Sequence, residues 1–174
     1  GNLLAGIYED IAERMVGDID FLVSEKKFFS TIKILKNNSY GKEENQNEYS
    51  TRNRHYTRLV KKGNIAAVEI HKEITLEKYT NEFNYSFVNK DSQLINGIIV
   101  LSYANKLNLS IIANQINDYG FYHKSMALRN AYDIFLLSKK TVAKDAVNTL
   151  DKLKHPLNCF LAACFEIFNQ ADSL

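Results

Sequence analysis

The sequence predicts an α+β fold, in which a small mixed β-sheet flanked by helices is followed by an all-helical C-terminal region. Residues 17–23 alternate acidic and apolar side chains and end in an apolar run, as expected for a strand with one buried face. We expect a β-hairpin of two strands, over residues 55–61 and 65–70, because Gly63 and Asn64 supply the positive backbone angles that a tight turn requires. The later part of the chain repeats apolar residues at helical spacing. We therefore expect two parts, residues 1–90 and 91–174.

The composition is that of an ordinary globular protein, with 174 residues, 45% of them hydrophobic and 24% charged. A formal net charge of +2 is too small to indicate a nucleic acid or an anionic membrane as partner by itself. No apolar run approaches the roughly 20 residues that span a bilayer. Cys159 and Cys164 lie in one apolar stretch, and we expect both to be buried, reduced thiols in a cytoplasmic protein.

In the first part, apolar spacing predicts helices over residues 2–15 and 25–37, the second with Ser24 as its N-cap. The polar residues 42–53 predict a loop or a weak strand. In the second part we expect five helices, over residues 91–107, 110–119, 121–138, 142–152 and 156–170.

Three acidic residues lie on the predicted strands. Asp18 and Asp20 would point to the same face of the first strand, because side chains alternate along a strand. Two adjacent carboxylates repel each other, and a hard divalent cation with oxygen ligands relieves that repulsion. The alternative is that both are solvated or paired with lysine. Glu69 is unusual in the middle of an apolar strand. Its alternative explanation is an edge position paired with Lys61 or Lys62.

This pattern resembles the DNA-polymerase-β-like nucleotidyltransferase superfamily, in particular its bacterial group of small uncharacterised nucleotidyltransferases. The matching residues are Gly1-Asn2, Tyr8, Arg14, Asp18-Ile19-Asp20-Phe21-Leu22-Val23 and Val68-Glu69-Ile70-His71. Tyr132-Asp133-Ile134 is similar to a helical element of related abortive-infection nucleotidyltransferases. Asn2 stands where the superfamily usually has Ser or Gly.

The resemblance implies a two-metal transfer reaction. Asp18, Asp20 and Glu69 would be the catalytic carboxylates and would hold Mg²⁺, or Mn²⁺ in its place. Glu69 would act as general base or as a ligand of the first metal. The reaction would move a nucleoside monophosphate from an NTP, with ATP favoured, to a hydroxyl of a protein, an RNA or a small molecule.

The resemblance also implies residues that bind the nucleotide. Gly1 and Asn2 at a helix N-terminus would offer backbone N–H groups to the phosphates, and Arg14 would reach the phosphates or neutralise the acids. His71 shares a face with Glu69 and would be an accessory residue of the site. The alternatives are an ordinary helix start for Gly1 and Asn2, a surface ion pair for Arg14 and a hydrogen-bonded structural histidine for His71.

Two other functions stay open. One is a catalytically silent nucleotidyltransferase-like module that binds a partner, as an antitoxin does. The other is a metal-dependent phosphohydrolase, which would require further His or Asp ligands. Arg52, Arg54 and His55 form a small basic cluster, for which a solvated loop is favoured over a nucleic-acid contact. Apart from the NTP and its acceptor, a protein partner or a homo-oligomer stays open, and no membrane is expected.

Overall fold

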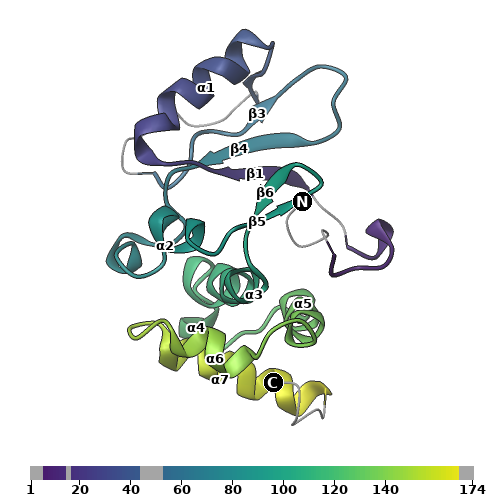
Figure 1. The fold of residues 1–174 in the computed structure, drawn as a ribbon, viewed down its shortest axis with the longest axis vertical. Coiled ribbons are helices and arrows are strands. Elements are labelled where there is room, and N and C mark those ends of the chain that lie inside the picture. Colours follow the sequence, from purple (N-terminus) through teal and green to yellow (C-terminus); the bar gives the residue numbers. More distant parts are fainter. Residues whose placement is uncertain (1–5, 15–16, 44–52, 169–174) are drawn as a thin grey trace.

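A computed structural model of the chain describes residues 6–14, 17–43 and 53–168. It confirms the α+β prediction: a small mixed sheet with α1 on one side lies above a layered group of helices (Figure 1). Among the described residues, no helix is both long and apolar enough to cross a membrane.

The sheet contains four strands in the order β1-β4-β3-β2. The strands are β1 (Asp18–Leu22), β2 (Gly41–Lys42), β3 (Leu59–Val60) and β4 (Ala67–His71). β1 pairs parallel to β4, whereas β2, β3 and β4 pair antiparallel in succession. The predicted hairpin is confirmed with shorter strands than expected, and Gly63 has a φ of 88° in its loop.

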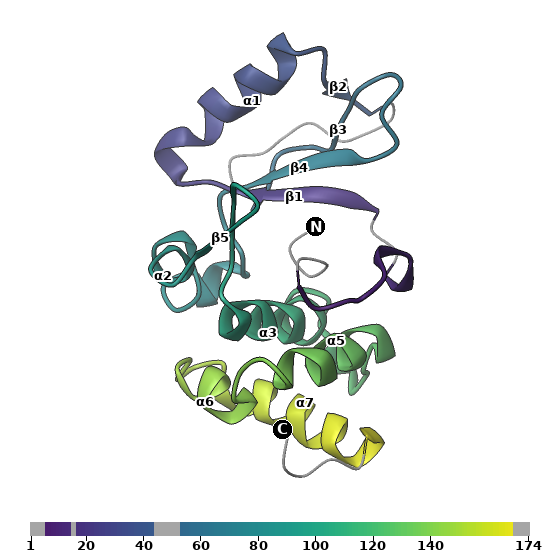
Figure 2. The same cartoon turned by 45° about the vertical axis from the view of Figure 1, so that its right-hand side comes forward.

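Helix α1 (Phe28–Asn37) covers one face of the sheet, as Figures 1 and 2 both show. Its buried Phe28 and Ile32 join Val68 and Ile70 of β4 in an apolar cluster. A short 3-10 turn, η2 (Glu25–Lys27), leads into it, so a helix over residues 25–37 is confirmed. Ser24 is the N-cap, but its side chain makes no capping hydrogen bond.

The second part of the chain is built mainly from helices. They are α3 (Tyr103–Ile112), the π-helical turn η4 (Ala113–Asn117), α4 (Gly120–His123), α5 (Leu128–Ser138), α6 (Ala143–Asn148) and α7 (Lys154–Phe168). α3 and α5 form the layer nearer the sheet, and α6 and α7 lie beyond them (Figure 2). The predicted interruption near residues 108–109 is wrong, because α3 continues through them.

The segment between sheet and helices differs most from prediction. A helix was expected over residues 91–107, but the chain forms a hairpin of β5 (Gln93–Ile95) and β6 (Ile98–Val100) before α3 begins. Asn96 and Gly97 have φ angles of 51° and 78°, the left-handed pair that a tight two-residue hairpin loop requires. This turn outweighs the helical spacing of the apolar residues around it.

The predicted helix over residues 2–15 is also wrong for its described part. Gly6 has a φ of 79°, which ends any helical path there, and only the 3-10 turn η1 (Ile11–Glu13) forms afterwards. Asp10 caps this turn by accepting a hydrogen bond from the backbone N–H of Ala12 at 2.8 Å. A further correction concerns the thiols: Cys164 is buried as expected, whereas Cys159 is exposed.

The larger apolar cluster joins the two parts of the chain. It is centred on the helices but includes Ile74, Phe83 and Val88 from before residue 90. Ile7, from the segment before β1, and Leu22, the last residue of β1, pack against the same cluster. The sheet and the helices therefore share apolar contacts, and the boundary near residue 90 stays a prediction. The remaining elements are η3 (Glu77–Tyr79) and α2 (Tyr85–Asn89).

Candidate active site

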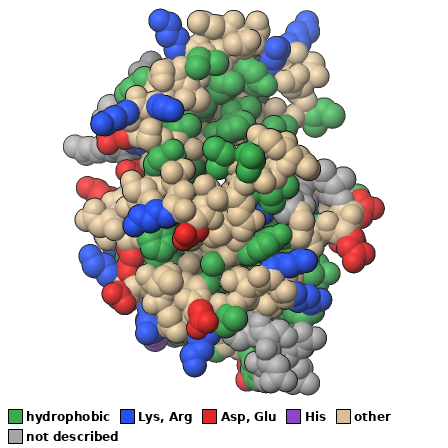
Figure 3. Space-filling model, in the orientation of Figure 1, with side chains coloured by type: hydrophobic (Ala, Val, Ile, Leu, Met, Phe, Trp, Pro, Cys, Tyr) green, Lys and Arg blue, Asp and Glu red, His purple; other side chains and the backbone are tan. Residues whose placement is uncertain are grey.

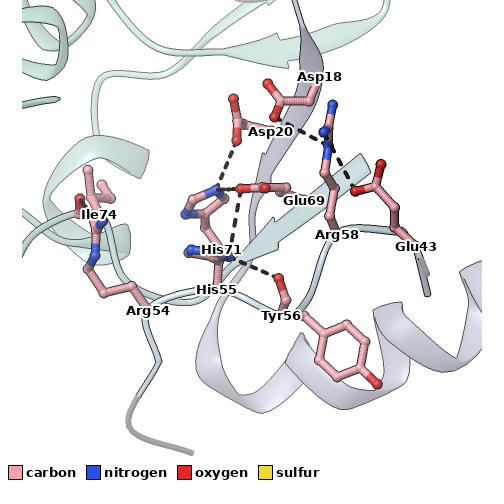
Figure 4. Close-up of polar contacts among 10 residues, drawn as sticks. All are labelled: Asp18, Asp20, Glu43, Arg54, His55, Tyr56, Arg58, Glu69, His71 and Ile74. Atoms are coloured by element: carbon pink, nitrogen blue, oxygen red, sulfur yellow. Dashed lines mark hydrogen bonds and ion pairs between the residues drawn. The ribbon is translucent and has the colours of Figure 1, made fainter. Parts of the chain in front are cut away.

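Strand register brings two acidic residues side by side. In the parallel pair of β1 and β4, Asp20 is the direct partner of Glu69. Paired residues of neighbouring strands point to the same face, and residues one position away point to the other. Val68 and Ile70 face α1, so Asp20 and Glu69 face away from it, towards the side seen in Figure 4.

His71 connects the two carboxylates. Its Nε2 lies 2.9 Å from Oδ1 of Asp20 and 3.6 Å from Oε2 of Glu69. One ligand atom from each of the three residues lies within 4.8 Å of the others, which is close enough for one metal ion. Figure 4 shows the three side chains turned towards one another from β1 and β4.

These contacts change the proton affinities of all three groups. Burial alone would lower the pKa of His71, but hydrogen bonds with Asp20 and Glu69 outweigh burial and raise the pKa to about 9. The hydrogen bond with His71 is the main cause that lowers the pKa of both Asp20 and Glu69, against the opposing effect of burial. At neutral pH the cluster therefore holds two carboxylates and one imidazolium.

A second histidine lies against the first. His55 forms an isolated antiparallel bridge with His71, and their ring centroids are 4.9 Å apart. Its Nδ1 lies 2.9 Å from the carbonyl oxygen of Tyr56 and 3.7 Å from Oε2 of Glu69. A proton on Nδ1 can be donated to that carbonyl, which leaves Nε2 of the ring as an acceptor.

Asp18 lies at the margin of the cluster. Its Oδ2 is 3.9 Å from Nε of Arg58, whose Nη1 is 3.7 Å from Oε2 of Glu43. Burial, followed by the negative charges of Asp20 and Glu69, raises the pKa of Asp18 above its usual value. The charges of Asp20 and Glu69 thus act on Asp18, but the oxygen atoms of Asp18 are not part of the three-residue cluster.

Arg14 is engaged elsewhere. Its Nε and Nη2 each lie 3.1 Å from a carboxylate oxygen of Asp133. The Asp133 side chain extends from α5 and is fully buried. The Tyr8 hydroxyl donates a hydrogen bond to the same carboxylate, and burial together with this bond raises the pKa of Tyr8. The predicted nucleotide-binding residues Gly1 and Asn2 lie outside the described residues.

Comparison with known proteins places the chain in a family. The model of a family described as "Uncharacterised nucleotidyltransferase" matches residues 1–169, which include both the sheet and the helices. The chain belongs to this nucleotidyltransferase family. No curated protein and no solved structure matches the chain.

The donor set of the cluster fits a divalent cation. Carboxylate oxygens suit Mg²⁺ and Mn²⁺, and an imidazole is a more usual ligand for softer divalent metals. His71 would have to lose its proton to ligate the ion, or else it keeps the proton and orients Asp20 from outside the metal's coordination shell. The two carboxylates are therefore the common part of either arrangement.

Sequence reasoning missed two neighbours of the cluster. His55 belonged to a basic cluster for which a solvated loop was favoured, and Arg58 was not singled out. His55 forms a bridge with His71 of β4, and Arg58 immediately precedes β3, which pairs with β4. Their positions therefore follow from a strand register that the sequence does not reveal. The only sequence indication was the placement of both residues within the predicted hairpin.

Proposed function

We propose that this protein moves a nucleoside monophosphate from an NTP, with ATP the first candidate, to a hydroxyl acceptor. The acceptor is a protein side chain, an RNA end or a small molecule. The observation that supports the proposal best is the register of β1 and β4, which sets Asp20 beside Glu69 on the face of the sheet that points away from α1. Membership of a nucleotidyltransferase family agrees with it.

The proposed roles follow from position and charge. Asp20 and Glu69, with Asp18 next to them, would hold Mg²⁺ or Mn²⁺. A bound cation would neutralise the triphosphate and stabilise charge on the departing pyrophosphate. Glu69 would accept the proton of the acceptor hydroxyl if its carboxylate is not fully occupied by metal.

His71 and Arg58 would support the carboxylates. The hydrogen bond from His71 fixes the rotamer of Asp20, which is otherwise an exposed side chain. Arg58 is about one-third exposed and is 3.9 Å from Asp18, so a phosphate oxygen could replace that carboxylate as its partner. Gly1 and Asn2 are retained as proposed phosphate contacts, whereas Arg14 would act indirectly, by fixing the segment that precedes β1.

The test is label transfer from each α-labelled NTP to the components of a cell lysate, with release of pyrophosphate measured in parallel. Asp20→Asn should reduce transfer at least about 100-fold, since even outer partners of a metal ligand contribute about 10- to 100-fold. Asp151→Asn is the matched control, because Asp151 is exposed and lies outside the cluster. Undiminished transfer by Asp20→Asn would remove this carboxylate from the mechanism.

A binding module without transfer activity is the second candidate. The observation in its favour is that Asp18 faces a guanidinium, which already supplies a positive charge beside the carboxylate. The two functions differ in their products. A silent module would bind Mn²⁺ or NTP, detectable as a rise in melting temperature, without forming pyrophosphate from any of the nucleotides.

A further inference from the structure

A groove lies on the opposite side of the sheet from the acidic cluster. It has a volume of about 590 Å³ and runs between α1 and the chain around β2 and β3. Its lining residues are Phe29, Ile32, Lys33, Lys36, Asn37, Lys42 and Tyr56. Three of these seven residues are lysines and none is acidic, so an anionic ligand fits the groove.

Positive charge is concentrated in this region of the chain. Residues 25–62 contain ten lysines and arginines against four glutamates, a net charge of +6, although the whole chain carries only +2. The rest of the chain therefore has a net charge of −4. Figure 3 shows Lys and Arg side chains along the upper end of the molecule, over the part that contains α1 and β3. The three lysines that line the groove give it a positive field that the total charge of the chain conceals.

Aromatic rings accompany the lysines. The Phe29 side chain is 62% exposed, and its ring stands edge-on to Phe28 with centroids 5.3 Å apart, which holds it in place. Tyr56 is buried at the base of the groove, and Nζ of Lys36 lies 5.4 Å from its ring centroid. An exposed ring among cations is the combination that stacks a nucleobase and pairs its phosphate.

From these observations we propose that the groove binds single-stranded nucleic acid. A single strand exposes its bases to Phe29 while its phosphates reach Lys33 and Lys36, whereas a duplex would keep its bases stacked inside. The concave shape suits a chain more than a flat bilayer. The groove lies on the α1 face, so the strand would bind apart from the acidic cluster around Asp20. The proposal does not depend on the transfer reaction.

The test is fluorescence anisotropy with a labelled single-stranded RNA of about 12 nucleotides, a DNA of the same sequence, and vesicles of phosphatidylserine and phosphatidylcholine. Wild-type protein should bind the oligonucleotides, with affinity falling steeply between about 50 and about 200 mM salt. The double substitution K33E/K36E should weaken binding at least about 10-fold and reduce the salt dependence. Phe29→Ala should weaken binding about 5-fold or more with the salt dependence unchanged.

The matched control is K140E/K144E, which changes the charge equally on exposed lysines of the helical part. It should alter affinity less than about twofold if the groove, rather than total charge, is responsible. Circular dichroism of each variant establishes that it is folded. Equal losses in both double variants, no binding by wild type at the lower salt, or binding of vesicles in place of oligonucleotides would each overturn the proposal. A difference between RNA and DNA would identify the preferred sugar.

Discussion

A single buried carboxylate joins the start of the chain to the helices. Asp133 on α5 accepts hydrogen bonds from both Tyr8 and Arg14, which are more than 100 residues away in the sequence. Arg14 precedes the acidic strand by four residues, so this contact ties the segment before β1 to α5. A buried ion pair adds little net stability over apolar residues of similar volume, because removing the charges from water is costly, but the loss of one partner leaves an uncompensated charge.

Breaking this pair should be strongly destabilising. Asp133→Ala should lower the free energy of unfolding by about 3–5 kcal/mol, because the partly buried guanidinium of Arg14 loses its carboxylate. Urea unfolding followed by circular dichroism measures the change. Asp151→Ala, at an exposed position, should stay within about 0.5 kcal/mol of wild type. A loss below about 1 kcal/mol for Asp133→Ala would mean that the pair is not desolvated as described.

Part of the candidate site could be predicted from single residues. Alternation along a strand placed Asp18 and Asp20 on one face, and an acid within apolar neighbours drew attention to Glu69. The sequence could not give the partners across strands, because register is set by the whole sheet. The sequence does not show the pairing of Arg14 with Asp133 either, because that contact depends on how α5 packs against the N-terminal segment.

At the scale of elements, the turn from η4 into α4 is tightly packed. A Cβ added at Gly120 would lie 2.6 Å from the backbone oxygen of Asn114 and 2.8 Å from Nε2 of Gln115. That amide also donates a hydrogen bond to the backbone oxygen of Ser125 at 2.9 Å, so it is not free to move aside. Glycine is therefore required by space at this turn.

Gly120→Ala should consequently destabilise the protein by about 1–3 kcal/mol, the usual cost of overpacking. Gly41→Ala is the matched control, because nothing lies within 4 Å of the Cβ position there. Thermal unfolding of both variants at equal concentration provides the comparison. The same change in melting temperature for the two variants would contradict the steric explanation.

Element prediction succeeded where periodicity and turn residues agreed. Residues 25–37 have both an apolar stripe and a preceding Ser24, and the hairpin before Ala67 has Gly63 at its turn. It failed over residues 91–107, where apolar residues at helical spacing surround Asn96-Gly97, the strongest short sequence indication of a hairpin. The spacing of apolar residues in a single sequence cannot distinguish a short apolar hairpin from the first turns of a helix. The turn residues Asn96 and Gly97 are therefore the better indication of the structure here.

The described residues form two apolar clusters, and β1 links them. The smaller cluster lies between α1 and the sheet, and the larger one lies among the helices and extends to Leu22 of β1. Because β1 thus contacts the helical core while it pairs with β4, neither cluster is independent of the other. We expect the two parts of the chain to unfold together.

This expectation is tested with one core truncation in each cluster. Leu59→Ala and Leu137→Ala remove fully buried side chains and should each lower the free energy of unfolding by about 2–5 kcal/mol. Both should shift one and the same transition, recorded by calorimetry and by circular dichroism. Two resolved transitions, each moved by only one of the variants, would show that the parts are separate folding units.

The parallel pairing of β1 with β4 has a consequence for partial chains. Asp20 and His71 are 51 residues apart, on parallel strands whose crossover connection contains α1, β2 and β3. A polypeptide still emerging from the ribosome, or clipped by a protease ahead of His71, carries the first acids without their counterparts. Whatever chemistry these groups perform is thus withheld from fragments and starts only once the fourth strand has docked.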